Sequence, residues 1–171
     1  VGKSVYSIYD GYISRIFVSP TGFGKAIYIT HTNGYTSVYG HLDKFIPEID
    51  KYVKEYQYSK EEFKVNIFPP KDKFVVKKGD LIAYTGNSGS SGGPHLHFEI
   101  RKTDGEKPIN PLLFQFNVKD YTRPRIYSLK VYPQTVNDYV NGSNKVFTTN
   151  TAGWGENYKL NTNDTILLKG N

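Results

Sequence analysis

The chain of 171 residues contains no cysteine and no methionine. Without cysteine it can form neither a disulfide framework nor a thiolate metal site, so any metal must be held by histidine and carboxylate. No apolar run is long enough to span a membrane, and no signal-peptide pattern is present. Because the initiator methionine is missing and strand-like patterns stand at both ends, we expect the chain to be a piece of a longer protein.

Aromatic residues are abundant, and the fifteen tyrosines and ten phenylalanines favour β-strands and are sufficient for a hydrophobic core. The 22 Lys and Arg residues outnumber the 16 Asp and Glu residues, which gives a net charge of +6. This excess favours anionic surroundings in general. The charges are scattered along the chain, however, so they indicate a solvated surface and identify no partner.

Two of the four histidines stand in the segment Gly-Gly-Pro-His-Leu-His-Phe at 92–98. Side chains alternate between the two faces of a strand, so His95 and His97 share one face. Leu96, Phe98 and Ile100 share the other face, which we expect to lie in the core. A pair of imidazoles on one strand face suits a metal ion or a proton transfer. Two solvent-exposed strand histidines are the alternative.

The dipeptide Asn33-Gly34 predicts a two-residue turn between strands at 25–32 and 35–42. In that register Tyr28 lies opposite Tyr39, and the residue opposite His41 is Ala26. Cross-strand partners share a face, so His41 lies with Tyr39 and Ser37, whereas His31 lies on the other face. His41 is therefore the better site candidate, and we expect His31 to be structural or merely exposed.

The remaining pattern is also rich in strands. We predict strands at 5–8, 11–18, 64–68 and 75–84, the last of them broken by a tight turn at Lys78-Gly79, and one short helix at 45–56. A loop of small residues at 86–94 precedes the histidine strand and allows close backbone approach. Within it, Gly89-x-Ser91-x-Gly93 matches the nucleophile elbow. A strand follows where that motif requires a helix, so a nucleophilic serine is disfavoured.

Several separated motifs together resemble the lysostaphin/LytM-type zinc metallopeptidases over about residues 1–114. They are Thr36-x-x-Tyr39-Gly-His41-Leu42, Val76-x-x-Gly79-Asp80-x-Ile82, Gly86-Asn-Ser-Gly, Ser91-Gly-Gly-Pro-His-Leu-His-Phe-Glu99 and Ile109-Asn-Pro111. The resemblance implies a mostly β fold, a small antiparallel sheet or barrel-like domain with an open groove. It also implies hydrolysis of peptidoglycan peptides through a zinc-bound water, in a periplasmic or extracellular part of the cell envelope.

The resemblance also assigns roles to residues. His97 corresponds to a zinc ligand, and His41 and His95 correspond to catalytic histidines. Two more zinc ligands come from a His-x-x-x-Asp motif that would precede Val1, so we expect this chain alone to be inactive and to hold zinc weakly. We expect Glu99, on the histidine face, to point to solvent, with orientation of a metal ligand as the alternative. No substrate-binding residue is predicted.

We expect a peptidase domain at 1–117, with an insertion at about 43–74 that is longer than in compact relatives. A partial β-rich unit at 118–171, the start of a β-sandwich with no chemical motif, should follow. We expect neither nucleic acid as a partner nor a lipid-spanning segment, and a protein partner stays open. Two other functions stay open as well: an inactive family member that acts as a binding or regulatory module, and a lipoyl-like carrier domain suggested by Val76–Ile82. The presence of all three site histidines favours the enzyme.

Overall fold

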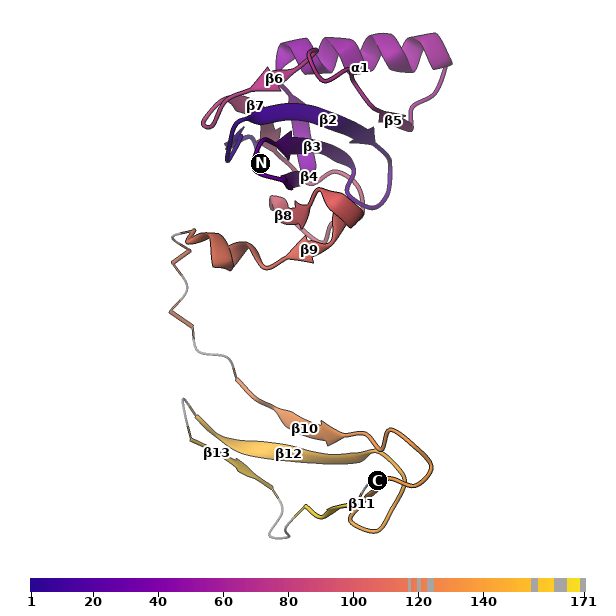
Figure 1. The fold of residues 1–171 in the computed structure, drawn as a ribbon, viewed down its shortest axis with the longest axis vertical. Coiled ribbons are helices and arrows are strands. Elements are labelled where there is room, and N and C mark those ends of the chain that lie inside the picture. The colour runs from indigo at the N-terminus through magenta and orange to yellow at the C-terminus, as the bar shows by residue number, and fades with distance from the viewer. Residues whose placement is uncertain (117, 120, 123–124, 155–156, 162–165, 170–171) are drawn as a thin grey trace. The chain divides into compact units, whose positions relative to one another are not determined.

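The structure is a computed structural model that describes residues 1–116, 118–119, 121–122, 125–154, 157–161 and 166–169. The chain forms two compact units, Val1–Asn117 and Val118–Asn171, which are described separately (Figure 1). The described residues include no helix that is both long and apolar enough to cross a membrane.

The first unit is built on one antiparallel sheet, which confirms the predicted mostly β fold. Its described strands follow the order β1-β7-β4-β3-β2-β5, while β6 pairs with β2, β8 pairs with β4, and β9 pairs with β8. Their bounds are β1 Ser4–Tyr6, β2 Gly11–Val18, β3 Lys25–His31, β4 Tyr35–Phe45, β5 Val65–Ile67, β6 Val75–Val76, β7 Leu81–Thr85, β8 His97–Lys102 and β9 Pro108–Ile109. Short 3-10 turns follow at Asp104–Glu106 and Pro111–Phe114.

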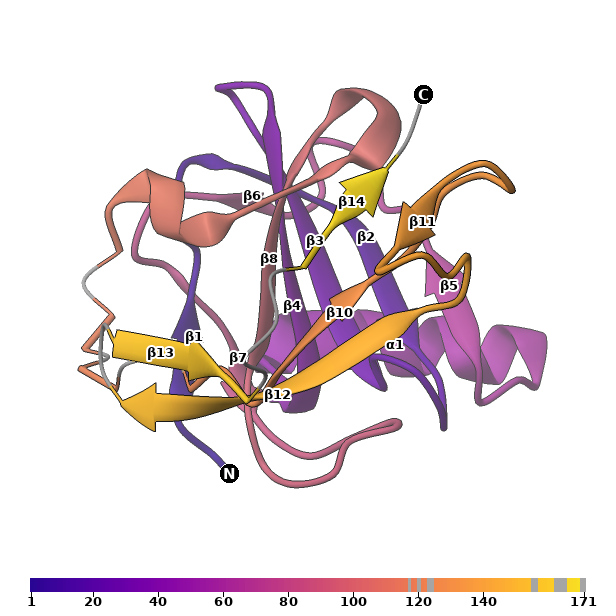
Figure 2. The ribbon, with the colours of Figure 1, turned by 90° about the horizontal axis from the view of Figure 1, so that it is seen from below.

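One helix, α1 (Pro47–Lys60), covers one face of this sheet (Figures 1 and 2). Proline suits the first turn of a helix because its fixed φ is helical and its missing N–H has no intrahelical partner there. The helix ends at Lys60, and Glu61 caps it in the left-handed conformation. The helix predicted at 45–56 is therefore confirmed, although it begins two residues later and ends four residues later than predicted.

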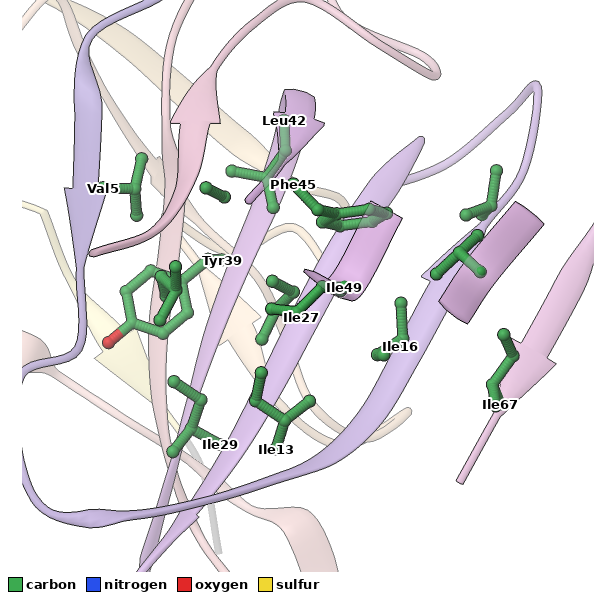
Figure 3. Close-up of a cluster of buried hydrophobic side chains, with 14 of the residues drawn as sticks. Val5, Ile13, Ile16, Ile27, Ile29, Tyr39, Leu42, Phe45, Ile49 and Ile67 are labelled. Atoms are coloured by element: carbon green, nitrogen blue, oxygen red, sulfur yellow. The ribbon is translucent and has the colours of Figure 1, made fainter. Parts of the chain in front are cut away.

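The hydrophobic core lies between α1 and the sheet (Figure 3). Ile49 and Val53 of the helix pack against strand residues that are almost fully buried. These strand residues include Ile13, Ile16, Ile27, Ile29, Tyr39 and Leu42. A smaller cluster of Ala26, Tyr28 and Val38, with Phe17 and Phe23 against it, lies on the sheet face turned away from the helix.

The predicted two-residue turn between β3 and β4 was wrong. Thr30 pairs with Thr36, so three residues, Thr32 to Gly34, form the loop. Gly34 donates its N–H to the carbonyl of His31 and has a φ of 84°. Three-residue hairpins commonly place such a left-handed residue last, so Asn-Gly can serve either geometry.

This register moves Ser37 and Tyr39 to the face of His31. The Nε2 atom of His31 lies 2.7 Å from the Ser37 hydroxyl, which lies 3.1 Å from the Tyr39 hydroxyl. His31 is buried, as a structural histidine should be. Burial lowers the pKa of His31, and hydrogen bonding to the carbonyl of Asp10 opposes that shift without reversing it.

A second irregularity keeps His41 on the other face. The β3–β4 register shifts between the Ile27–Tyr39 pair and the Lys25–Leu42 pair, and His41 itself has a φ of 56°. The chain therefore gains a residue at this point, as in a β-bulge, and the side chain of His41 is turned. His31 and His41 lie on opposite faces as predicted, although the predicted pairing was not the reason.

The histidine segment also differs in detail from expectation. Strand β8 begins at His97, and His95 precedes it in an isolated bridge to Gly86. Phe98 and Ile100 face the core as predicted. Leu96 lies outside the regular strand and is 36% exposed, so its predicted core position was wrong.

The second unit is also made of strands. β10 (Ser128–Val131), β12 (Phe147–Trp154) and β13 (Asn157–Leu160) form an antiparallel sheet. β11 (Tyr139–Val140) pairs with β14 (Leu168–Lys169). That this unit is the start of a β-sandwich domain stays a prediction.

Candidate metal and catalytic site

The three histidines singled out in the sequence converge on one point of the first unit. One ring nitrogen from each of His41, His95 and His97 lies within 4.8 Å of the others. The ring centroids of His41 and His95 are 4.7 Å apart, and those of His41 and His97 are 5.8 Å apart. The expected convergence is confirmed although more than fifty residues separate His41 from the other two. The role of each residue stays a prediction.

Backbone carbonyls orient two of these rings. The Nδ1 atom of His41 lies 2.8 Å from the Ser88 carbonyl oxygen, and that of His95 lies 2.8 Å from the Gly93 carbonyl oxygen. A carbonyl only accepts hydrogen bonds, so both Nδ1 atoms carry hydrogen. The Nε2 atom of each neutral ring therefore keeps its lone pair for a metal or a proton.

A carboxylate orients the ring of His97, and it does so through Nε2 rather than Nδ1. Its Nε2 atom lies 2.6 Å from Oε1 of Glu99, whose Oε2 accepts a 2.7 Å hydrogen bond from Nε of Arg101. The Nδ1 atom of His97 is thus the nitrogen left with a lone pair. A carboxylate behind a histidine is typical of metal sites, where it fixes the ring and raises its basicity.

Glu99 therefore does not point to solvent, and that expectation was wrong. Its side chain is 19% exposed and lies between His97 and Arg101, which both donate hydrogen bonds to it. Partial burial by itself would raise the pKa of Glu99. Hydrogen bonds from Arg101 and His97 outweigh that effect and hold the pKa below its ordinary value. Glu99 is thus a stable anion beside the histidine cluster.

Small and aromatic neighbours leave room for the ring of His97. Gly40 pairs with His97, and a Cβ atom at Gly40 would lie 3.3 Å from the Cβ of His97 and 3.4 Å from that of Phe23. The Phe23 ring lies 4.5 Å from the His97 ring, with 31° between their planes. Gly40 and Phe23 thus both lie directly against His97. Gly40 lies within the quoted motif around His41, whereas nothing in the sequence assigned Phe23 to the site.

The small-residue loop before β8 is fixed against the turn before β3. Gly89 has a φ of 74°, and a side chain there would overlap the backbone of Gly24. Ser90 donates its N–H to the carbonyl of Gly22, and the Ser88 hydroxyl accepts a 2.9 Å hydrogen bond from the Lys25 N–H. The close backbone approach expected for this loop is thus an approach to another loop. It sets the position of the carbonyl that orients His41.

Ser91, the residue at the nucleophile position of the formal elbow motif, has another role. Its hydroxyl donates a 2.7 Å hydrogen bond to the carbonyl of Gly93. The Nδ1 atom of His95 lies 3.3 Å from that hydroxyl but is itself a donor to the same carbonyl. His95 therefore offers no base to Ser91, which agrees with the disfavoured nucleophilic serine.

The donor set fits a zinc ion. Imidazole nitrogens are common zinc ligands, and two ligands of one zinc lie at most about 4.2 Å apart. The three nitrogens lie within 4.8 Å of one another, which is slightly more than this distance, so all three can face one ion but need not all bind it.

A cavity of about 710 Å³ lies elsewhere in the unit, between α1, β6 and β7. None of the three histidines lines it.

Sequence comparisons relate the chain to known proteins. The Peptidase family M23 model matches residues 1–58 and 64–111. Peptidoglycan DD-endopeptidase ShyB of Vibrio cholerae is 33% identical over 116 residues, which cover 66% of this chain and 22% of that protein. Murein hydrolase activator NlpD of Salmonella typhimurium is 30% identical over 113 residues, which cover 66% of this chain and 23% of that protein.

Among solved structures, the catalytic domain of lysostaphin from Staphylococcus simulans is 25% identical, with a TM-score of 0.48. That match covers 67% of this chain and 71% of the lysostaphin domain. The chain spans less than a quarter of the two relatives named above. The family model matches more than half of this chain, and the chain therefore belongs to Peptidase family M23.

Proposed function

We propose that the first unit is a zinc-dependent endopeptidase that hydrolyses peptide bonds of peptidoglycan in the cell envelope. The observation that carries this proposal is the orientation of His41, His95 and His97. Each ring has one nitrogen fixed by an acceptor, and one ring nitrogen from each of the three histidines lies within 4.8 Å of the others. Relatives of the same family, such as the peptidoglycan DD-endopeptidase, support peptidoglycan peptides as substrate.

Within this proposal, Nδ1 of His97 would hold the zinc ion, and Glu99 would keep the ring in that tautomer. Zinc bound there supplies Lewis acidity and lowers the pKa of a bound water towards about 7. His41 and His95 act at the peptide, because a neutral Nε2 accepts a proton and the protonated ring then donates to the developing oxyanion or the leaving amine.

The first experiment is a set of single substitutions tested for peptidoglycan hydrolysis by zymography and for zinc content. The protein should include its own upstream residues, because residues 1–171 contain no His-x-x-x-Asp motif. His95→Ala should abolish hydrolysis with zinc content near normal, and His97→Ala should lose both. For His41 the suitable change is Asn, which tolerates a positive φ. It should behave like His95→Ala.

His31→Ala is the control, since His31 lies on the opposite face of the sheet and should not take part in hydrolysis. Full hydrolysis by His95→Ala would contradict the assigned roles.

Zinc titration tests the expected weakness of the site in this chain alone. Residues 1–171 should bind zinc weakly, because only His97 has a family ligand role, whereas hydrolytic zinc sites normally have three protein ligands. The extended protein should bind tightly at one ion per chain. Equal and tight binding by both proteins would show that this ligand assignment is wrong.

A second candidate function is a catalytically inactive regulator of wall hydrolysis. It is favoured by the likeness to a relative whose name is murein hydrolase activator. The purified full-length protein, loaded with zinc, should release no peptide on its own if this function holds, and it should instead accelerate a separate wall hydrolase. Release of peptides by the protein alone would favour the enzyme.

A further inference from the structure

The sheet face that carries the histidines extends well beyond them. Arg15 on β2 pairs with Tyr28 on β3. Tyr28 pairs with Val38 on β4, which pairs in turn with Glu99 on β8. Directly paired residues share a face, so Arg15 and Glu99 stand at the two ends of one row on the face turned away from α1. Three strand spacings of about 4.8 Å place Arg15 about 14 Å from the strand of His97.

The guanidinium group of Arg15 is held in place by rings and an amide. Its central carbon lies 4.7 Å from the Tyr28 ring centroid, 5.6 Å from that of Phe17 and 5.7 Å from that of Phe68. Its Nε donates a 2.7 Å hydrogen bond to Oδ1 of Asn66. These contacts surround the guanidinium with three rings and use one of its donors. They leave the two terminal nitrogens without a described hydrogen-bond partner.

Two of these contacts come from the insertion. Asn66 belongs to β5 and pairs with Phe17 of β2, and Phe68 follows at the end of β5. The insertion therefore does more than cover the core with α1, because it adds an edge strand to the sheet and fixes Arg15 with that strand. A chain with a shorter connection after β4 would lack both contacts.

Arg15 also lacks a counter-charge, which distinguishes it from the neighbouring Arg101. Arg101 lies 5.7 Å from the Tyr28 ring centroid and forms ion pairs with Glu99 and Glu106. Among the described residues, no acidic side chain lies within ion-pair distance of Arg15. An oriented, weakly hydrated guanidinium with free terminal donors matches the geometry of a carboxylate.

We propose that Arg15 binds a carboxylate of the substrate, so that the unit selects an acidic peptide lying across the strands. This inference rests on the proposed function and adds the chemical class of the substrate. At about 3.3 Å per extended residue, the roughly 14 Å between the strands of Arg15 and His97 corresponds to about four residues of an extended peptide.

Binding is the first test, because it does not depend on hydrolysis. The probes are a peptidoglycan stem tetrapeptide with free carboxyl groups and the same peptide with its carboxyl groups amidated, titrated calorimetrically in the presence of a chelator. The wild type should bind the free form roughly 10-fold to 100-fold more tightly, as expected for one charge-assisted pair. Arg15→Gln should bind both forms with the affinity that the wild type shows for the amidated form.

Two further variants separate this role from a structural one. Asn66→Ala should reduce the preference several-fold, because the guanidinium loses its orienting acceptor while its charge remains. Lys73→Gln is the matched control, since Lys73 also lies over two rings, 5.4 Å from the Tyr52 centroid and 6.0 Å from that of Phe74. Those rings pack against the core on the α1 side. This control should keep the full preference.

Equal affinity of the wild type for the two peptides would overturn the proposal, and so would a preference that survives in Arg15→Gln. If Arg15→Gln does not fold, Asn66→Ala decides, and an unchanged preference in that variant overturns the proposal. A preference for the free form without hydrolysis in the zinc-loaded full protein would refute the enzyme but not the Arg15 site. Hydrolysis without the preference would refute only the site.

Discussion

Ser88 joins three segments of the first unit, and its substitution tests the account of the site most directly. The hydroxyl donates a 2.7 Å hydrogen bond to the carbonyl of Leu42 and accepts a 2.9 Å hydrogen bond from the N–H of Lys25. Its own carbonyl accepts the 2.8 Å hydrogen bond from Nδ1 of His41. The residue thus connects the small-residue loop to β3 and β4 and fixes a ring of the site.

Ser88→Ala should lower the free energy of unfolding, and it should leave the ring of His41 less firmly oriented. Each backbone group left without its partner costs about 1–3 kcal/mol when buried. Because Leu42 is buried and Lys25 is partly exposed, we expect a total loss of about 2–4 kcal/mol. Urea unfolding should show this loss as a lower midpoint with an unchanged slope, since the exposed surface on unfolding stays the same.

Ser88→Thr is the control, because it keeps the hydroxyl and should lie within about 1 kcal/mol of the wild type. A second readout follows the His41 ring by nitrogen NMR. The Nδ1–H tautomer should dominate in the wild type and lose that dominance in Ser88→Ala. A loss of less than about 0.5 kcal/mol together with an unchanged tautomer would refute the reasoning.

Three further predictions follow from other contacts. Burial lowers the pKa of His31 below 6.5, so the unfolded chain takes up a proton at a higher pH than the folded chain, and the unfolding free energy should fall as pH drops through about 6.5. In urea titrations between about pH 7 and 5, His31→Gln should show a smaller fall than the wild type. An equal fall in the two proteins would contradict this prediction. Glu99→Gln should weaken zinc binding by the extended protein about 10-fold to 100-fold in chelator competition, whereas an unchanged affinity would remove Glu99 from the site. Ile49→Ala, which empties a position that is 1% exposed, should cost about 2–5 kcal/mol in thermal or urea unfolding, and a cost below about 1 kcal/mol would show that α1 does not contribute to the core.

The sequence predicted the strands and their faces because side chains alternate with a period of two, and that alternation is a local property. It placed His97 and Phe98 on opposite faces of β8, and the structure agrees. It could not choose between a two-residue and a three-residue loop at Asn33-Gly34, because both geometries accept these residues. The three-residue loop puts His31 and Ser37 on one face, where they are hydrogen-bonded, and this contact spans six residues of the chain.

The environment of the histidines was less accessible to sequence reasoning. The alternation placed Glu99 on the face of His97. The same rule extends to Arg101, two residues further along, so the contact between Glu99 and Arg101 could have been inferred from that spacing. Ser88 and Arg15 could not have been found in this way. Their contacts to His41 and to Asn66 span 47 and 51 positions of the chain and depend on how the loops and β5 meet the sheet.

The left-handed backbone at His41 has a consequence for how this site can be lost. Strand β4 pairs with β8 through Gly40 and with β7 from Leu42 onwards, so His41 lies where the strand exchanges one partner for another. Most replacements there would strain the backbone, whereas Asn tolerates a positive φ. A histidine codon becomes an asparagine codon by a single base change. Under the role that the proposed function gives to His41, the mutational route from an active chain to a folded but inactive one is therefore short. Asparagine is the residue to look for at position 41 in a relative that keeps the fold without the activity.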